Sequence, residues 1–396
     1  MAQVWAGADA GKAHHHCVVI DADGRRLLSR RVANDEPELL ALIADVIALA
    51  DKVTWAVDVP DGGAALLIGL PIARDQELLY ISGLAVNRAA DGYRGEGKTD
   101  ARDAAVIADQ ARIRRDLVPL RPGDEITTEL KILTARRADL VADRTRAVNR
   151  LRGLLTGIFP ALERALPDLT QAGPLILLTG YQTPAAIRAA GPAGLQAHLA
   201  GRKVRNPGKL AALAAGAAAR QHTALPAEQL TASLIATLAG EVMALNEQIK
   251  QAGKLIEDRF HRHQLAAVIE SLPGIGVLLG AEFLAATGGD MAFFATPSRL
   301  AGFAGLAPAP RDSGRIHGNL HRPRYYHRGL NRVFYYSAMI SLAHCPESRR
   351  FYHRKRAEGK RHTQAVLALA RRRVDVLWAM LRDNRPYQAT PPPAAA

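Results

Sequence analysis

Two aspartates three residues apart, Asp100 and Asp103, open a predicted helix over residues 99–115. Positions i and i+3 lie on one helix face, so both carboxylates point the same way and offer a paired acidic site. Acidic residues in a first helical turn also complement the helix dipole. The pair alone therefore leaves both a chemical and a purely structural role open.

Two earlier aspartates extend this pattern. Asp9 falls within a predicted strand at 3–10, and Asp58 lies at the end of a predicted strand at 53–59. These segments can converge with the helix start at one sheet edge, where four carboxylates repel one another unless a divalent cation neutralises them. Oxygen ligands suit Mg²⁺ or Mn²⁺, and two such ions can clamp both oxygens of a phosphodiester displacement. The alternative is that Asp9 and Asp58 cap helices or face solvent.

Hydrophobic periodicity predicts the elements that would position these acids. Strands are predicted at 3–10, 15–21, 25–33, 53–59 and 77–82, and helices at 35–50, 62–73 and 99–115. Strands that alternate with helices indicate an α/β layer domain, which we assign to residues 1–120.

Two later stretches have the heptad-like spacing of long paired helices. Apolar residues recur at Ile126, Leu130, Leu133, Leu140, Val148, Leu151 and Leu155, and again at Leu230, Leu234, Leu238, Val242, Leu245 and Ile249. The stretches 124–160 and 227–260 are thus predicted to form an antiparallel coiled coil or a dimerisation stalk. The intervening 161–226, rich in Ala, Gly and Pro, predicts a helical insert, so the coiled-coil region spans 121–265.

The charge of the chain favours a polyanionic partner. With 52 Lys and Arg against 38 Asp and Glu, the net charge is +14 and the pI is near 10.1. Residues 1–120 carry a net −4, which leaves +18 for the remainder, and residues 311–382 hold 17 basic against four acidic side chains. Nucleic acid is the simplest partner, although basic helices can also lie on anionic membranes.

Cysteine usage and hydropathy indicate a cytoplasmic protein with no membrane association. Only Cys17 and Cys345 occur, without the spacing of a disulfide framework or a zinc finger. No leader-like start and no apolar run of about 20 residues is found. The three histidines at 14–16 suggest a metal site, but neighbours on a strand alternate faces, which favours a plain strand or turn.

The C-terminal part contains two loops with chemical potential. The turn LPGIG holds Gly274 and Gly276, whose missing side chains let backbone N–H groups approach a phosphate, although a plain helix–helix turn has the same composition. In APAPRDSGR, Ser313 lies between Arg311 and Arg315, which could stabilise charge on a phosphate that its hydroxyl attacks. Loop serines are more often turn formers.

Several motifs together resemble a known family. GADAGK with Asp9, the acid of WAVDVP, KTDARDA, LPGIG, FAGLAPAPRDSGR and HRGLNR are similar to those of the bridge-RNA-guided insertion-sequence transposases, the DEDD or IS-one-ten family. The similarity covers nearly the whole chain. It implies an N-terminal RuvC-like domain of the ribonuclease H type, coiled-coil helices, and a mostly helical transposase domain at 266–388, followed by a disordered Pro/Ala tail at 389–396.

The resemblance assigns roles to particular residues. It makes Asp9, Asp58, Asp100 and Asp103 the ligands of Mg²⁺ or Mn²⁺, and Ser313 the nucleophile that becomes linked to the cleaved DNA strand. We predict nucleic-acid contacts at Arg311, Arg315, Gly274, Gly276, Arg328 and Arg332. The family also implies donor and target DNA, a structured noncoding guide RNA, and a dimer or tetramer in which the acids of one subunit meet the serine of another. Such a bacterial enzyme is expected at the nucleoid when it is bound to DNA.

One departure from the family pattern concerns the second acid. The family usually has Glu followed by a small residue, Thr and Gly, whereas this chain has Asp58 followed by Val, Pro and Asp61. Asp61 could therefore share or replace the role. Two other functions stay open: a Holliday-junction nuclease that uses the acids with a water nucleophile, and a nucleic-acid-binding copy that has lost activity.

Overall fold

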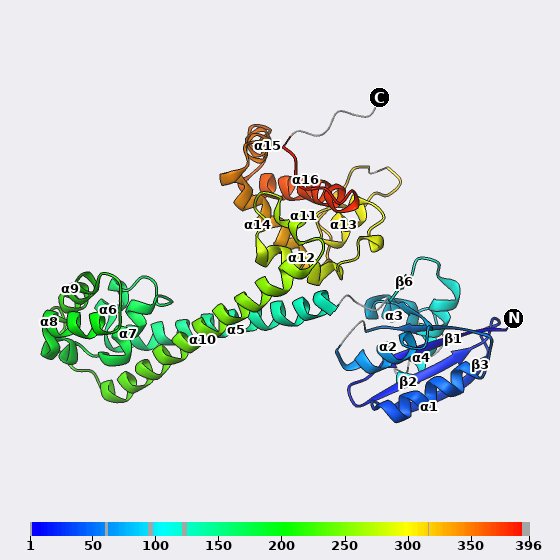
Figure 1. The fold of residues 1–396 in the computed structure, drawn as a ribbon, viewed down its shortest axis with the longest axis horizontal. Helices are drawn as coiled ribbons and strands as arrows, with labels where there is room; N and C mark the ends of the chain where they lie inside the picture. The colour runs from blue at the N-terminus through cyan, green and yellow to red at the C-terminus, as the bar shows by residue number, and fades with distance from the viewer. Residues whose placement is uncertain are drawn as a thin grey trace. The chain divides into compact units, whose positions relative to one another are not determined.

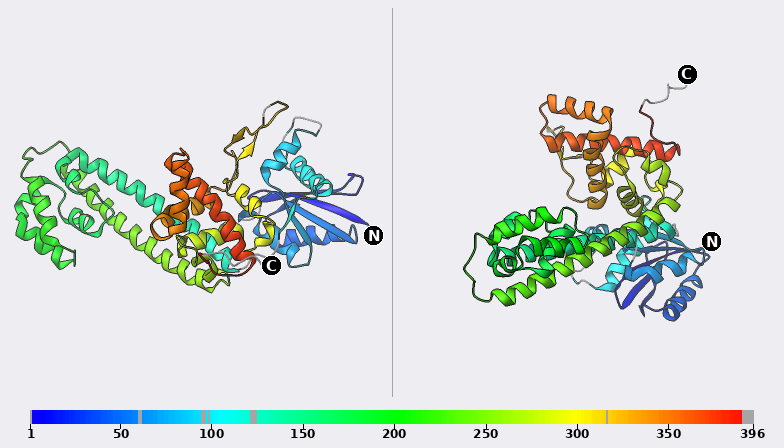
Figure 2. Two further views of the ribbon diagram at one scale, coloured as in Figure 1. Left: turned by 90° about the horizontal axis from the view of Figure 1, so that it is seen from above. Right: turned by 60° about the vertical axis from the view of Figure 1, so that its left-hand side comes forward.

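The computed structural model describes residues 2–59, 62–93, 97, 99–120, 125–315 and 317–389. Contacts divide the chain into two compact units, Met1–Gly123 and Asp124–Ala396 (Figures 1 and 2). Each unit is described here by itself. Asp61 and the tail from residue 390 onward, on which two predictions fall, lie outside the described residues.

The first unit is built on a six-stranded sheet. Its strands are β1 (Gln3–Ala10), β2 (His14–Ile20), β3 (Arg26–Ala33), β4 (Lys52–Val57), β5 (Glu77–Tyr80) and β6 (Val118–Pro119), in the spatial order β3-β2-β1-β4-β5-β6. The first three strands pair antiparallel, β4 and β5 run parallel to β1, and β6 is antiparallel to β5. The five predicted strands are therefore confirmed to within about two residues, and β6 is additional.

Helices cover the sheet in two groups. One core cluster joins Leu39, Ile43 and Leu67, from α1 (Glu36–Ile47) and α2 (Ala65–Ile72), to alternate residues of β1. A further cluster contains Val86 and Ile107, from α3 (Gly83–Ala90) and α4 (Asp100–Ile113), and another contains Ala104 of α4. Because residues along a strand alternate faces, the two groups lie on opposite sides of the sheet and form an α/β layer domain.

Gly7 in the middle of β1 allows α4 to cross the sheet closely. A Cβ atom at this position would lie 2.3 Å from both the Ala104 carbonyl oxygen and the Ala108 amide nitrogen. No side chain fits such a gap without moving the helix. This contact fixes the first turns of α4, which carry Asp100 and Asp103, against the strand that carries Asp9.

Two long antiparallel helices organise the second unit. They are α5 (Glu125–Ile158) and α10 (Glu228–Arg262). Arg144 on α5 donates to Asn246 Oδ1 at 3.2 Å, and Arg259 on α10 pairs with Glu129 at 2.7 Å, so the start of α5 lies beside the end of α10. The predicted helix pair is thus present, and its supercoiling remains a prediction.

The prediction of which residues of α10 face the other long helix is partly wrong. Leu230 and Leu234 are 65% and 47% exposed, whereas Ala232, Ile235 and Ala239 are buried. The buried positions keep a spacing of three and four residues but are shifted along the helix. Small alanines fill the contact because they let the two helices approach closely, and a reading based on leucines alone misses them.

Two helical groups enclose the ends of this pair (Figures 1 and 2). At one end, the insert forms α6 (Pro160–Ala165), α7 (Ala172–Gly180), α8 (Pro184–Gly201) and α9 (Pro207–Ala218), and shares a core with Leu155 and Ile235. At the other end lie α11 (Ala266–Glu270), α12 (Val277–Thr287), α13 (Pro297–Phe303), α14 (Arg328–His344), α15 (Pro346–Ala357) and α16 (His362–Arg382), with the short strands β7 (Ala309–Pro310) and β8 (Leu320–His321). Leu130 and Phe260 of the long helices belong to the core of this second group, which therefore crosses the predicted boundary at 265.

Other predictions concern single features of the chain. Cys17 and Cys345 are both free and buried. His15 is buried and His14 exposed, so the three histidines alternate along β2. Among the helices that the structure describes, none is long and apolar enough to cross a membrane.

Candidate active site

Asp9 and Asp58 lie next to each other at one edge of the sheet. The parallel register of β1 and β4 ends with Ala8 opposite Val57, so the residues that follow are Asp9 and Asp58. Adjacent strands are about 4.8 Å apart. The carboxyl end of β4 and the last residues of β1 thus bring two of the four predicted acids together.

The carboxylate of Asp58 is perturbed by burial and by its neighbours. Its carboxylate accepts a hydrogen bond from the Ala10 backbone N–H, while its buried Oδ1 has no hydrogen-bond partner. Burial raises the pKa of Asp58, the charge of Asp103 raises it further, and the Ala10 N–H opposes both effects. Oδ2 lies 3.8 Å from the point where a side chain on Gly83 would begin, at the start of α3.

The start of α4 brings the other two acids to the same edge. Thr99 caps the helix by accepting from the Arg102 amide at 3.2 Å. Asp103 is close enough to act on the pKa of Asp58, and Asp100 acts on the pKa of His16, the residue opposite Asp9 in β2. Burial lowers the pKa of that histidine, and Asp100 opposes the effect.

These residues fit a hard divalent cation in their chemistry. The donors are carboxylate oxygens, one of which is buried and unpaired on Asp58. Within the described part of the chain, however, no three His, Cys, Asp or Glu side chains are close enough together to hold a metal ion. The structure therefore brings the acids to one edge without forming a complete ligand shell.

Arg102 was not among the predicted functional residues, although it lies between Asp100 and Asp103. Its guanidinium donates to three backbone carbonyls, those of Gly97 at 2.7 Å, Ala90 at 3.1 Å and Tyr93 at 3.1 Å. The side chain thus ties Ala90 at the end of α3, Tyr93 and Gly97 to the first turn of α4. A basic residue between two paired acids was the only sequence signal for this role.

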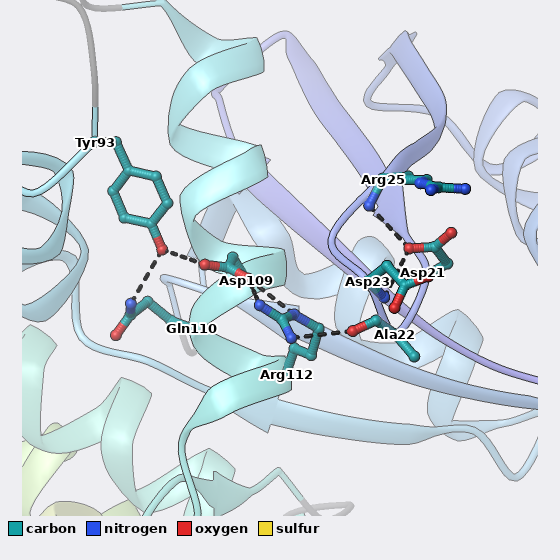
Figure 3. A network of polar contacts seen from close by, with 8 residues as sticks. All are labelled: Asp21, Ala22, Asp23, Arg25, Tyr93, Asp109, Gln110 and Arg112. Atoms are coloured by element: carbon teal, nitrogen blue, oxygen red, sulfur yellow. Dashed lines mark hydrogen bonds and ion pairs between the residues drawn. The ribbon is translucent and has the colours of Figure 1, made fainter.

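A second polar network holds the other half of α4 (Figure 3). Asp109 accepts from the Tyr93 hydroxyl at 2.6 Å and pairs with Arg112 at 2.7 Å. Arg112 also donates to the Ala22 carbonyl at 3.1 Å, in the turn between β2 and β3 that Asp21 closes by accepting from the Arg25 amide. The helix is therefore held at both halves, which fixes the positions of its N-terminal acids.

Ser313 lies in an exposed hairpin of the second unit. β7 and β8 pair antiparallel, and the Arg311 amide donates to the Asn319 carbonyl at 2.8 Å. Asp312 accepts from the Asn319 amide at 2.9 Å, which closes the base of the loop. Ser313, Arg311 and Arg315 are all exposed, so the hydroxyl and both guanidinium groups are accessible to a large substrate.

The two glycines of the LPGIG turn have different surroundings. Gly274 has a φ of +90°, and a Cβ there would lie 2.5 Å from the Ser337 carbonyl oxygen on α14. This glycine is required for close packing inside the domain. Gly276 is exposed at the N-terminus of α12, with nothing within 4 Å of the Cβ position, so it alone keeps the open backbone expected at a phosphate site.

The two arginines of HRGLNR also differ. Arg328 begins α14 and is exposed. Arg332, one turn later, pairs with Glu282 of α12 at 2.6 Å. Burial raises the pKa of Glu282, and Arg332 opposes that shift. Arg332 therefore already has a carboxylate partner within the domain, whereas Arg328 is available to a ligand.

Comparison with known proteins decides the family. A sequence model described as a transposase of the DEDD IS110 type matches residues 6–160, and a model described as the transposase IS116/IS110/IS902 family matches residues 266–353. The 42 kDa protein of insertion element IS900 from Mycobacterium paratuberculosis is 61% identical over the full length of both chains. This chain belongs to the IS110 family of transposases.

Further relatives agree with this assignment. The 44.8 kDa protein of insertion element IS116 from Streptomyces clavuligerus is 50% identical, over 98% of this chain and 97% of the relative. The pilin gene-inverting protein of Moraxella bovis is 30% identical over 37% of this chain and 45% of its own length.

As an IS110-family transposase, the chain is an enzyme of DNA recombination and transposition, and the DEDD family suggests that it uses a divalent metal. The match over residues 6–160 contains all four acids, and the match over residues 266–353 contains Ser313.

Proposed function

We propose that this IS110-family transposase exchanges DNA strands through the hydroxyl of Ser313, assisted by Mg²⁺ or Mn²⁺ at Asp9, Asp58, Asp100 and Asp103. The single observation that carries the proposal is the approach of Asp103 to the buried, half-paired carboxylate of Asp58 at a sheet edge. A RuvC-like, ribonuclease H type assignment of the first unit is supported by its three antiparallel strands followed by parallel ones.

The proposed reaction starts with attack by Ser313. Its Oγ forms a bond to the phosphorus of the scissile phosphodiester, and the bond from phosphorus to one sugar oxygen breaks. In net terms the serine proton passes to the departing sugar oxygen, which becomes a hydroxyl, so the ester bond to the serine conserves the energy of the cleaved linkage. A bound divalent ion would supply Lewis-acid stabilisation of the phosphate charge. Arg311 and Arg315, beside the hydroxyl, would stabilise the remaining charge, and a hydroxyl of a second strand would later displace the serine.

The proposed partners are donor and target DNA and a structured guide RNA. The net +18 charge outside residues 1–120 supports a large contact with nucleic acid. A relative whose name says that it inverts a pilin gene supports strand exchange as the reaction type. Within a bacterial cell, such an enzyme would act at the nucleoid.

We further propose a dimer or tetramer in which the acids of one subunit act with Ser313 of another. The exposed leucines of α10, Leu230 and Leu234, and Ile132 on α5, which is 65% exposed, support a contact between copies along the long helices. Such an arrangement would unite catalytic groups that lie in separate units of one chain.

Substitution of the serine tests the proposal. Ser313→Ala should abolish covalent protein–DNA adducts on a cognate substrate supplied with Mg²⁺ and the copurified RNA, as measured by denaturing gel electrophoresis. Ser298→Ala, an exposed serine of α13, is the matched control and should keep adduct formation. Adducts that persist in Ser313→Ala would refute the serine role. Cleavage without adducts in the wild type would instead indicate a water nucleophile and a junction nuclease.

A further inference from the structure

The second unit contains a cavity that the proposed reaction does not use. It has a volume of about 310 Å³ and lies between α15, α16 and residues 383–389, with Leu272 of the LPGIG turn in its wall. This volume falls at the lower end of the range of small-molecule sites. None of the residues of the Ser313 hairpin lines it.

A buried guanidinium forms part of the cavity wall. Arg373 is 4% exposed and donates to Ser337 Oγ at 2.8 Å and to the Pro273 carbonyl. A guanidinium has five N–H donors, and no carboxylate within the described residues pairs with this one. Burial lowers the pKa of Arg373 to about 10, so the group is still charged at neutral pH. An uncompensated buried charge is costly, and an anion in the cavity would offset that cost.

The acids of the cavity already have basic partners. Glu347 pairs with Arg350 at 3.2 Å and accepts from the Cys345 thiol at 3.4 Å. Asp383 pairs with Arg382 at 2.7 Å. Neither of these arginines lines the cavity, so each carboxylate has a basic partner outside it, and Arg385 of the wall also helps to lower the pKa of Asp383.

Two further arginines add positive charge to the wall. Arg372 and Arg385 are exposed and form no ion pair with the described residues. The Arg372 guanidinium lies 5.3 Å from the centre of the Phe351 ring, where a cation–π contact holds it. Arg385 acts on the pKa of Asp383 in the same wall, so Arg372 and Arg373 are the two guanidinium groups of the cavity that no carboxylate of the described residues pairs with.

Much of the remaining wall is apolar and partly aromatic, with Ser348 and Gln388 as further polar residues. Leu272, Phe351, Leu369, Val376 and Met380 line it. Tyr387 closes one side, because its amide donates to Ser271 Oγ at 2.8 Å and holds the segment 383–389 over the cavity. Burial raises the pKa of Tyr387 to about 12, so its hydroxyl is a neutral hydrogen-bond donor. The ligand that fits this wall has both an anionic and an apolar part.

We propose that this cavity binds a single nucleotide, with its phosphate against Arg372, Arg373 and Arg385 and its base against the apolar wall. A nucleotide joins a phosphate to a flat ring of low polarity, which matches both halves of the wall. The nucleotide is either free or an unpaired residue of a bound strand. This site depends on neither Ser313 nor the four acids, so it can be tested independently of the proposed reaction.

Calorimetric titration of the full chain tests the proposal. The probes are thymidine monophosphate, thymidine, inorganic phosphate and a short single-stranded oligonucleotide. The double variant Arg372→Gln/Arg385→Gln should weaken binding of the monophosphate or of the oligonucleotide by about tenfold or more, since two charge-assisted contacts are lost. Arg356→Gln, an exposed arginine of α15 outside the cavity, is the matched control and should bind like the wild type.

A cavity-filling variant separates the cavity from surface charge. Ala379→Phe adds volume to the wall without changing charge, and should weaken the same probe to a similar degree. A response of the monophosphate identifies a free nucleotide, and a response of the oligonucleotide alone identifies a nucleotide within a strand. If neither probe responds to Ala379→Phe in a variant that unfolds like the wild type, or if Arg356→Gln weakens binding equally, the proposal is wrong.

Discussion

Burial and a neighbouring charge both act on the carboxylate of Asp58. Because burial and Asp103 raise its pKa, ionisation of Asp58 is less favourable in the folded chain than in the unfolded chain. Stability is therefore lost as the pH rises from the ordinary aspartate range through the raised pKa, and the loss is complete above it. A bound divalent cation would reverse this effect by stabilising the ionised form.

The variant Asp58→Asn tests, at neutral pH, whether ionisation of Asp58 destabilises the fold and whether a cation reverses this effect. Without metal, the variant should unfold at a temperature roughly 1 to 4 °C above the wild type, because the cost of ionisation is removed. Added Mg²⁺ should raise the unfolding temperature of the wild type and not of Asp58→Asn, as measured by scanning calorimetry in chelator and in Mg²⁺. Asp23→Asn, in the exposed turn between β2 and β3, should behave like the wild type. An equal response of Asp58→Asn to Mg²⁺ would exclude Asp58 as a ligand.

At the scale of the elements, the position of the acids depends on contacts that α4 makes elsewhere. Arg102 holds the carbonyls of Ala90, Tyr93 and Gly97, and Gly7 lets the helix lie directly on β1. A strand end and a helix start have no reason to meet unless such contacts fix the helix. The active-site edge is thus a product of packing along the whole length of α4.

Arg102→Ala should loosen the connection between α3 and α4. Three carbonyls lose their donor, so amide hydrogen exchange in the peptide spanning residues 86–93, which holds two of them, should accelerate by about tenfold or more. Arg102→Lys should exchange nearly as fast as Arg102→Ala, because one ammonium group cannot reproduce the planar guanidinium with its several donors. Arg115→Ala, an exposed arginine beyond the end of α4, is the control. Exchange that is unchanged in Arg102→Ala would show that the connection is held by other contacts.

At the scale of the whole molecule, the two units have separate cores. No core cluster contains residues of both units among the residues that the structure describes. We expect two unfolding transitions in calorimetry. Asp58→Asn should shift only the transition of the first unit, since its carboxylate contacts that unit alone. A single transition that shifts as a whole would show that the units are coupled, in which case the acids and the Ser313 hairpin unfold together.

Local patterns predicted most of the elements of the first unit and the two long helices of the second. Alternating apolar residues marked the strands, and the acidic start at Asp35 marked α1, whose cap it is. The helix α3 was missed because it has only eight residues, about two turns, which are too few for a clear helical periodicity. The shifted face of α10 was missed because alanine carries little hydrophobic signal, yet it is the residue that lets helices approach.

By itself, the sequence determined the family, the α/β character of the first unit, the paired long helices and the choice of acids and serine as candidates. Residue type and spacing are local properties, and they suffice for these conclusions. Only the tertiary structure decided that Gly274 serves packing, that Arg332 already has a partner in Glu282, and that Arg373 is buried without a carboxylate. These facts depend on which distant segments meet, and burial changes the cost of a charge far more than its position in the chain does.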